Sequence, residues 1–142
     1  MFLIHPILQG CAILLSLYVA YLGSQRFFTL HLKRKRRFFW KRHVALGITV
    51  MVILLAGIVG GLSAVRIFWH GFLVTGQHGK TGLSLVPFIL FGIITGLYMN
   101  RKKKKRLALP LIHGVNNTFI IIVALSQVYT GIGIYKAFIL GN

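Results

Sequence analysis

Four apolar segments constrain the fold of this chain more than any other feature of its sequence. They cover about residues 4–25, 43–65, 79–99 and 108–137. Each has the length of about 20 apolar residues that an α-helix needs to cross a bilayer core about 30 Å thick. Short links join the segments and leave no room for a soluble domain. The sequence therefore predicts an all-α fold, a transmembrane four-helix bundle that runs up-down-up-down, as a single integral-membrane domain over residues 1–142.

The charges of the chain are all positive and lie mostly on one side of the predicted bundle. The chain has 17 Lys and Arg residues and no Asp or Glu. Fourteen of the 17 lie in or beside the first and third links: Arg26, Lys33 to Arg37, Lys41, Arg42 and Arg101 to Arg106. The positive-inside rule places these links in the cytoplasm. We therefore expect a bacterial inner (cytoplasmic or energy-transducing) membrane, with both chain termini in the periplasm.

The absence of carboxylates excludes several function classes. Acid–base catalysis by paired carboxylates has no residues to use, and small exporters and proton relays normally carry an acid within the membrane. The basic links favour membrane lipids as partners, because each cation near the surface gains about 1 kcal/mol from anionic headgroups. They do not favour nucleic acid, whereas a docked acidic subunit stays open as an alternative.

Histidine and glycine recur in register in the four segments. Each segment opens at a histidine, and a glycine follows each histidine after 18 residues; the pairs are His5–Gly23, His43–Gly61, His78–Gly96 and His113–Gly131. Eighteen residues are about five turns, so each glycine shares the face of its histidine at the far side of the membrane. Histidine ligates metals and glycine lets a bulky ring approach the backbone, so the pattern suggests two bound haems.

A 35-residue repeat strengthens this pattern. It relates the last three of the four histidines, and it aligns further glycines on the same stripe of each helix: Gly47, Gly57 and Gly61, and Gly82, Gly92 and Gly96. Thr95-Gly96 also matches Thr130-Gly131. Small residues at helix contacts are common in membranes for packing alone. Their coupling to histidine favours contact with a cofactor.

Helix directions divide the histidines into two predicted ligand pairs. His5 and His78 begin on the periplasmic side, whereas His43 and His113 begin on the cytoplasmic side. Facing helices of a bundle can hold a cofactor between them, so we predict one haem b per pair. Gly61 and Gly131 lie at the depth of the periplasmic haem, and Gly23 and Gly96 at the depth of the cytoplasmic one. Cations near the helix ends are candidates for the propionates: Arg42, Arg66, Lys80 and Arg106.

The remaining candidates have weaker signals. His31 and His70 are interpreted as surface residues, with His70 as the rival periplasmic ligand. Cys11 is interpreted as a packing residue, and Pro87 predicts a kink. Several polar residues could form interhelical hydrogen bonds, support a ligand or bind a quinone headgroup: Gln9, Asn116, Asn117, Gln127 and Tyr129.

Four motifs together resemble a known group of proteins. They are His5-Pro6 with Leu8-Gln9-Gly10, Trp40-Lys41-Arg42-His43 with Gly47, Gln77-His78 with Gly82, and Leu109-Pro110 with His113-Gly114 and Asn116-Asn117. They resemble small bacterial four-helix membrane proteins, a family of unknown function that is similar to cytochrome b-561. The resemblance implies two b-type haems held by His5, His43, His78 and His113, and electron transfer across the membrane. The wider class has six helices in eukaryotes, and this chain has no evident ascorbate-binding motif.

The sequence thus predicts a di-haem cytochrome that links a quinone pool to another redox subunit, with a c-type cytochrome as one candidate partner. Whether it is an enzyme in its own right or a subunit of a quinol oxidoreductase is left open. The alternative is a haem-free structural or anchor subunit, in which the glycines pack helices and the basic links dock a partner.

Overall fold

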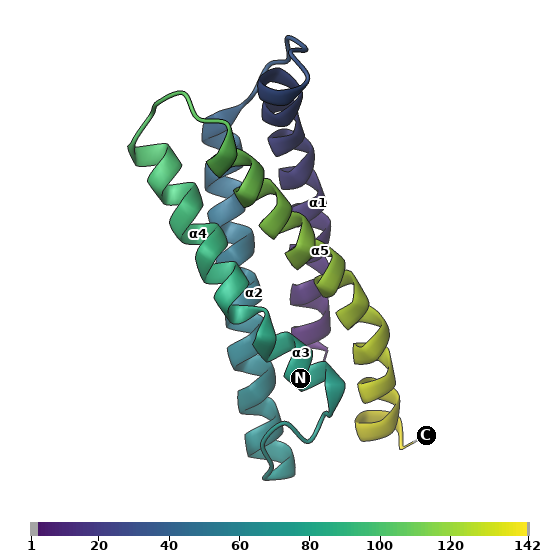
Figure 1. Cartoon of the computed structure of the whole chain (residues 1–142). Coiled ribbons are helices and arrows are strands. Elements are labelled where there is room, and N and C mark those ends of the chain that lie inside the picture. Colours follow the sequence, from purple (N-terminus) through teal and green to yellow (C-terminus); the bar gives the residue numbers. More distant parts are fainter. Residues whose placement is uncertain (1–2, 142) are drawn as a thin grey trace.

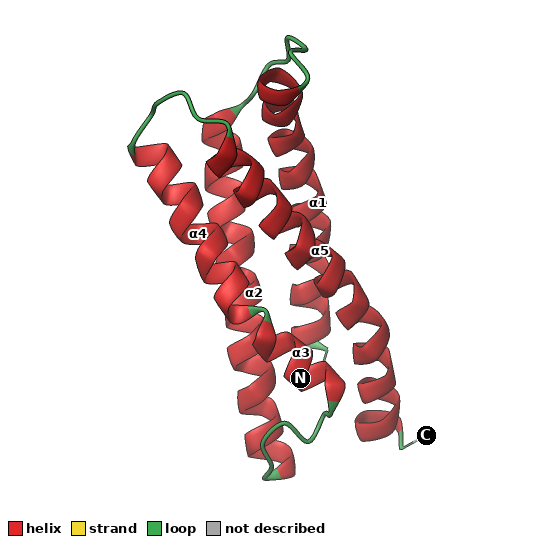
Figure 2. Ribbon diagram, viewed as in Figure 1, coloured by secondary structure: helices red, strands yellow, loops and turns green. Residues whose placement is uncertain are grey.

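Four long apolar helices run antiparallel to one another in the computed structural model, which describes residues 3–141 (Figure 1). The elements are α1 (Ile4–His31), α2 (Trp40–Trp69), α3 (Gln77–Ser84), α4 (Val86–Arg101), α5 (Ala108–Tyr135) and the π-helical turn η1 (Lys136–Leu140). Between residues 3 and 141 the helices are joined by loops alone, without a strand (Figure 2). The predicted all-α four-helix bundle is confirmed.

The third membrane segment is broken in two. Leu85 separates α3 from α4, and its backbone N–H donates to the Gly82 carbonyl at 3.2 Å. Pro87 stands in the first turn of α4, where its missing N–H costs least. The kink predicted at Pro87 is confirmed, and the break lies two residues before the proline because its ring disfavours helical geometry upstream.

The helix contacts define two diagonals of the bundle. α1 packs against α2 and α5, and α4 packs against the same two helices, while α3 contacts α2, α4 and α5. α1 therefore lies opposite the α3–α4 segment, and α2 lies opposite α5. Each diagonal joins two helices that begin at the same end of the bundle.

The two ends of the bundle differ in chemistry. We call the end with links 32–39 and 102–107 the basic end, and the end with the link 70–76 and both chain termini the terminal end. Figure 1 shows the two basic links together at the top and the termini at the bottom. The fold thus gathers the charges of both basic links in one place.

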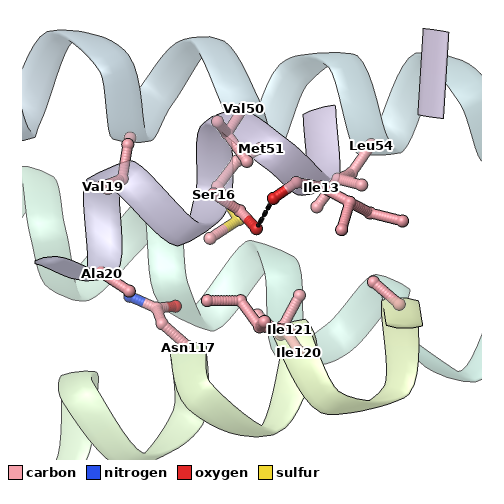
Figure 3. A pocket seen from close by; sticks show the side chains of 12 residues that line it. Ile13, Ser16, Val19, Ala20, Val50, Met51, Leu54, Asn117, Ile120 and Ile121 are labelled. Atoms are coloured by element: carbon pink, nitrogen blue, oxygen red, sulfur yellow. Dashed lines mark hydrogen bonds between the residues drawn. The ribbon is translucent and has the colours of Figure 1, made fainter. Parts of the chain in front are cut away.

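The middle of the bundle is a closed apolar core. Its most buried members come from all four segments: Ala12, Val50, Leu54, Leu85, Ile89 and Ile120. Beside them lies a cavity of about 40 Å³ with an almost wholly apolar lining, where the Ser16 hydroxyl is already bonded to the Ile13 carbonyl (Figure 3). Such a cavity stays dry, since a buried water needs two to four polar partners.

The outer surface is as apolar as the core. Leu14, Val59 and Ile94 are each more than 60% exposed, which suits contact with lipid rather than with water. Together with four helices long enough to cross a bilayer, this makes the chain a multi-pass membrane protein. Cys11 is exposed on this surface, so its interpretation as a packing residue is wrong for the helix contacts within this chain. Its position in α1 turns it outward.

Ile89 and Ile94 provide a matched test of this packing within α4. Ile89 is fully buried, whereas Ile94 is 64% exposed. Ile89→Ala should lower the free energy of unfolding by about 2–5 kcal/mol, because it leaves a cavity among rigid neighbours. Ile94→Ala should change it little. Unfolding by a denaturing detergent, followed by circular dichroism, measures both, and equal losses would contradict the assignment of the core.

Candidate functional site

The two helices α1 and α2 are held together by two reciprocal histidine–glycine contacts. The imidazole of His5, at the start of α1, packs on Gly61 near the end of α2. The imidazole of His43, at the start of α2, packs on Gly23 of α1. A Cβ at position 61 would lie 3.2 Å from Cε1 of His5, and one at position 23 would lie 3.0 Å from Cε1 of His43. Only glycine leaves these rings their full space.

The second half of the bundle repeats the arrangement. His113 of α5 packs on Gly96 of α4, and His78 of α3 packs on Gly131 of α5, with Cβ-to-Cε1 distances of 3.3 and 3.2 Å. In an antiparallel pair with equal 18-residue spacings, each histidine meets the glycine of its neighbour. The sequence predicted that these glycines face the haems. They lie level with the histidines of the neighbouring helix, as predicted. In this structure, however, each glycine contacts the imidazole of that helix.

One turn further along, the same contacts pair a larger residue with glycine. Gln9 fills the space beside Gly57, and Asn117 fills the space beside Gly92. Beside His43 and His78, the glycine is instead the residue four positions after the histidine. A Cβ at Gly47 would lie 3.7 Å from Cγ1 of Val19, and one at Gly82 would lie 3.6 Å from Oε1 of Gln127. The whole glycine stripe therefore sets the spacing within each antiparallel helix pair, as small residues do in membranes.

The histidines form two facing pairs, one at each end. The ring centres of His5 and His78 are 6.3 Å apart at the terminal end, and those of His43 and His113 are 6.4 Å apart at the basic end. A direct hydrogen bond between two imidazoles would bring the centres to about 5 Å. Two imidazoles on directly opposite sides of one metal, at about 2.0–2.1 Å from each nitrogen, would have centres about 6.4 Å apart. Each pair thus has the spacing for one metal ion.

Hydrogen bonds from the neighbouring helix orient three of the four rings. Nδ1 of His43 lies 3.1 Å from the Val19 carbonyl, which can only accept, so Nδ1 carries the proton. Nδ1 of His113 lies 2.8 Å from the Thr95 hydroxyl, and Nδ1 of His78 lies 3.0 Å from the Thr130 hydroxyl. Such partners fix the orientation of each ring. The role of the threonines was not predicted, although the repeated Thr-Gly dipeptide was its signal.

His5 is the exception among the four. Its Nδ1 is buried without a hydrogen-bond partner. The Gly57 carbonyl interacts with this ring, but outside the geometry of a full hydrogen bond. Gly57 precedes Gly61 by four residues, as Val19 precedes Gly23. His43 and His5 thus each lie beside a backbone carbonyl of the neighbouring helix. His43 forms a full hydrogen bond with it, whereas His5 does not.

A large cavity opens at the basic end between all four segments. Its volume is about 1040 Å³, at the upper limit of the roughly 300–1,000 Å³ typical of ligand pockets. His43 and His113 line it together with Gly23 and Gly96, and its mouth carries cations of the 102–107 link, including Arg106. Apolar walls beneath a cationic mouth suit a large, flat ligand with anionic groups.

The predicted anion-binding cations differ in their placement. Arg106 lines the cavity, and its Nη2 is buried without a hydrogen-bond partner. Arg42 lies outside the lining and donates to the Tyr18 hydroxyl at 3.3 Å. At the opposite end, Arg66 donates to the His70 carbonyl at 3.2 Å and Lys80 is exposed. Of the four predicted cations, Arg106 is therefore the one that lines the basic-end cavity.

His31 lies elsewhere than the sequence suggested. It was interpreted as a surface residue of the link, but α1 continues to His31 rather than ending near residue 25. The longer helix carries its ring to the cavity, where it is half-buried and stacks on Phe27 with ring centres 5.0 Å apart. His70 is exposed at the end of α2, away from the histidine pairs.

No group of three or more histidine or cysteine side chains gathers into a metal site within residues 3–141. Each facing pair consists of two histidines. No protein-family model, curated protein or solved structure matches the chain. A proposal for the function of this chain therefore rests on its sequence and on the geometry of the site.

Gly60 and Gly61 allow a test of the histidine–glycine contact at adjacent positions. Nothing lies within 4 Å of a Cβ at Gly60, whereas His5 adjoins Gly61. Gly61→Leu should displace the imidazole and destabilise the protein by about 1–3 kcal/mol. Gly60→Leu should be neutral or stabilising by up to about 1 kcal/mol, since leucine favours helix more than glycine does. Thermal unfolding in detergent distinguishes them, and similar melting temperatures would refute a specific contact at Gly61.

Proposed function

We propose that this chain is a di-haem b-type cytochrome that transfers electrons across a membrane. The observation that carries the proposal is the spacing of the two histidine pairs, 6.3 and 6.4 Å between ring centres, at opposite ends of one bundle. A pair of imidazoles on either side of one metal is the ligation of a b-type haem with two axial histidines. The resemblance to cytochrome b-561 in the motifs around these histidines supports the same function.

The basic-end residues fit such a group. His43 and His113 would hold the haem iron through their imidazole nitrogens. The cavity beside them has apolar walls for the ring and the buried Nη2 of Arg106 for a propionate. At the terminal end, His5 and His78 would hold the second haem.

When bound, each haem iron carries one electron by alternating between its ferric and ferrous forms. The chain's residues do the rest. The histidines fix the two sites about 27 Å apart along α1, from the level of His5 to that of Gly23. The apolar core between them, with Ile89 and Ile120 almost fully buried, keeps water out of the middle of the bundle.

The charge distribution indicates the setting of this reaction. The basic end would face the cytoplasm of a bacterial inner membrane under the positive-inside rule. A quinone pool and a second redox subunit, such as a c-type cytochrome, are the proposed partners. Because the chain has no carboxylate side chain, proton release from a quinol would use water, histidine or a haem propionate.

A haem-free structural subunit is the second candidate. The observation that favours it is the reciprocal packing of His5 on Gly61 and His43 on Gly23, which joins α1 to α2 without any ligand. Under this alternative the imidazoles serve as packing groups and the basic links anchor a larger membrane complex.

An absorbance spectrum of the purified protein decides between the two. The di-haem proposal predicts a reduced α band and about two haems per chain. His5→Ala and His78→Ala should each remove one and the same haem, while His43→Ala and His113→Ala should each remove the other.

His70→Ala is the control for these variants, since His70 is exposed at the end of α2 and belongs to neither facing pair. It should retain both haems. A colourless wild-type preparation, even after haem is supplied during expression, would favour the structural subunit instead.

Arg106 and Arg42 test the anion-binding role. Arg106→Gln should weaken haem retention at the basic end and lower the midpoint potential of that haem, because a nearby positive charge favours the ferrous form. Arg42→Gln removes an equal charge at the same end but outside the cavity lining, and should have a smaller effect. Redox titration followed by absorbance measures both, and equal effects would exclude a specific contact with Arg106.

A further inference from the structure

We infer that Thr95 is a positioning residue that fixes the tautomer of His113 and so makes its Nε2 the ligand atom, and that Thr130 does the same for His78. The ligand role of these histidines rests on the proposed function, whereas the tautomers rest on hydrogen bonds within the chain. Both threonines directly precede the glycine that receives the imidazole. In each Thr-Gly dipeptide, the glycine therefore leaves space for the imidazole and the threonine hydroxyl orients it.

The position of the Thr95 hydroxyl proton follows from its neighbours. The hydroxyl oxygen lies 2.7 Å from the Phe91 carbonyl oxygen and 2.8 Å from Nδ1 of His113. Two oxygens at 2.7 Å repel unless a proton lies between them, so the single hydroxyl proton points to the carbonyl. The hydroxyl must then accept from His113, and Nδ1 of His113 carries the proton.

The far side of the His113 ring agrees with this assignment. Its Nε2 lies 2.9 Å from the Asn117 amide nitrogen, which can only donate. Asn116 donates to the Asn117 oxygen at 3.2 Å, which fixes the orientation of the Asn117 amide. Nε2 is therefore the acceptor of the ring. In this structure its lone pair accepts from Asn117 at the wall of the cavity that His43 also lines, so a ligand at Nε2 would take the place of that amide.

Thr130 has the corresponding place beside His78, with longer contacts to the carbonyls of its own helix. Thr130 bonds the Gln127 carbonyl at 3.3 Å and Nδ1 of His78 at 3.0 Å. His43 uses the Val19 carbonyl instead. Each facing pair thus contains one ring supported by a threonine and one beside a backbone carbonyl. A backbone carbonyl or an accepting hydroxyl at Nδ1 leaves Nε2 unprotonated, the form in which a histidine nitrogen can bind a metal.

The test begins with the full-length protein without haem. Nitrogen-15 NMR of histidine-labelled protein in detergent distinguishes the two tautomers, and a His113→Ala variant assigns the His113 signal. We expect the Nδ1–H form in the wild type and a mixture of tautomers in Thr95→Val, which keeps the shape of the side chain but cannot accept. Thr95→Ser should restore the Nδ1–H form. Thr49→Val, whose hydroxyl bonds only its own helix, is the matched control.

A hemin titration gives the second readout. Loss of such an orienting group typically costs about 10–100-fold in metal affinity, so Thr95→Val should weaken binding at one of the two sites by that factor and Thr95→Ser should not. Should Thr95→Val not fold, Thr95→Ala repeats both measurements.

The outcomes separate this inference from the proposed function. Unchanged tautomers and unchanged hemin affinity in Thr95→Val would overturn the positioning role. A wild type that takes up no hemin while Thr95→Val still alters the His113 tautomer would overturn the cytochrome proposal and leave the positioning of the ring established.

Discussion

The contact of an imidazole with a glycine of the antiparallel neighbour is the interaction on which the rest of the structure depends. It occurs four times, always at the two ends of a helix pair, as with His5 on Gly61 and His43 on Gly23. Each contact fixes the helix spacing and the position of the histidine at once. A helix pair in this register cannot form without placing one imidazole at each end. Packing and the candidate ligand site are therefore one feature of the fold.

The diagonal arrangement turns four such contacts into two sites. Neighbouring helices exchange a histidine and a glycine, whereas opposite helices face each other with histidines across the bundle axis. Because opposite helices start at the same end, His5 meets His78 and His43 meets His113. The two sites then lie at the two ends, with a dry apolar core between them. Two sites at opposite ends of the bundle fit the proposed transfer of electrons across a membrane.

The sequence predicted the helices, the kink near Pro87 and the grouping of the histidines, because these follow from apolar length, proline chemistry and an 18-residue spacing. It did not predict that the glycines receive the neighbouring imidazoles, since spacing gives the depth of a residue and not its partner. It also placed His31 outside the helices, because the end of α1 lies among polar and basic residues that hydropathy reads as a link. The Thr-Gly repeat was visible, but a hydroxyl can serve many partners, and only the fold brings Thr95 to His113.

The absence of acidic residues explains the choice of histidine partners. Ligand histidines commonly donate to a carboxylate, yet a charged carboxylate is costly within a bilayer. This chain has none, and it uses neutral acceptors, the Val19 carbonyl and the threonine hydroxyls. The same absence leaves the cations of the basic end without carboxylate side chains to pair with. Some stack on aromatic rings, as Lys103 does on Trp40. At the cavity mouth, Arg106 stacks on Tyr98 in the same way, and its Nη2 has no hydrogen-bond partner among residues 3–141, which fits the proposed anionic ligand.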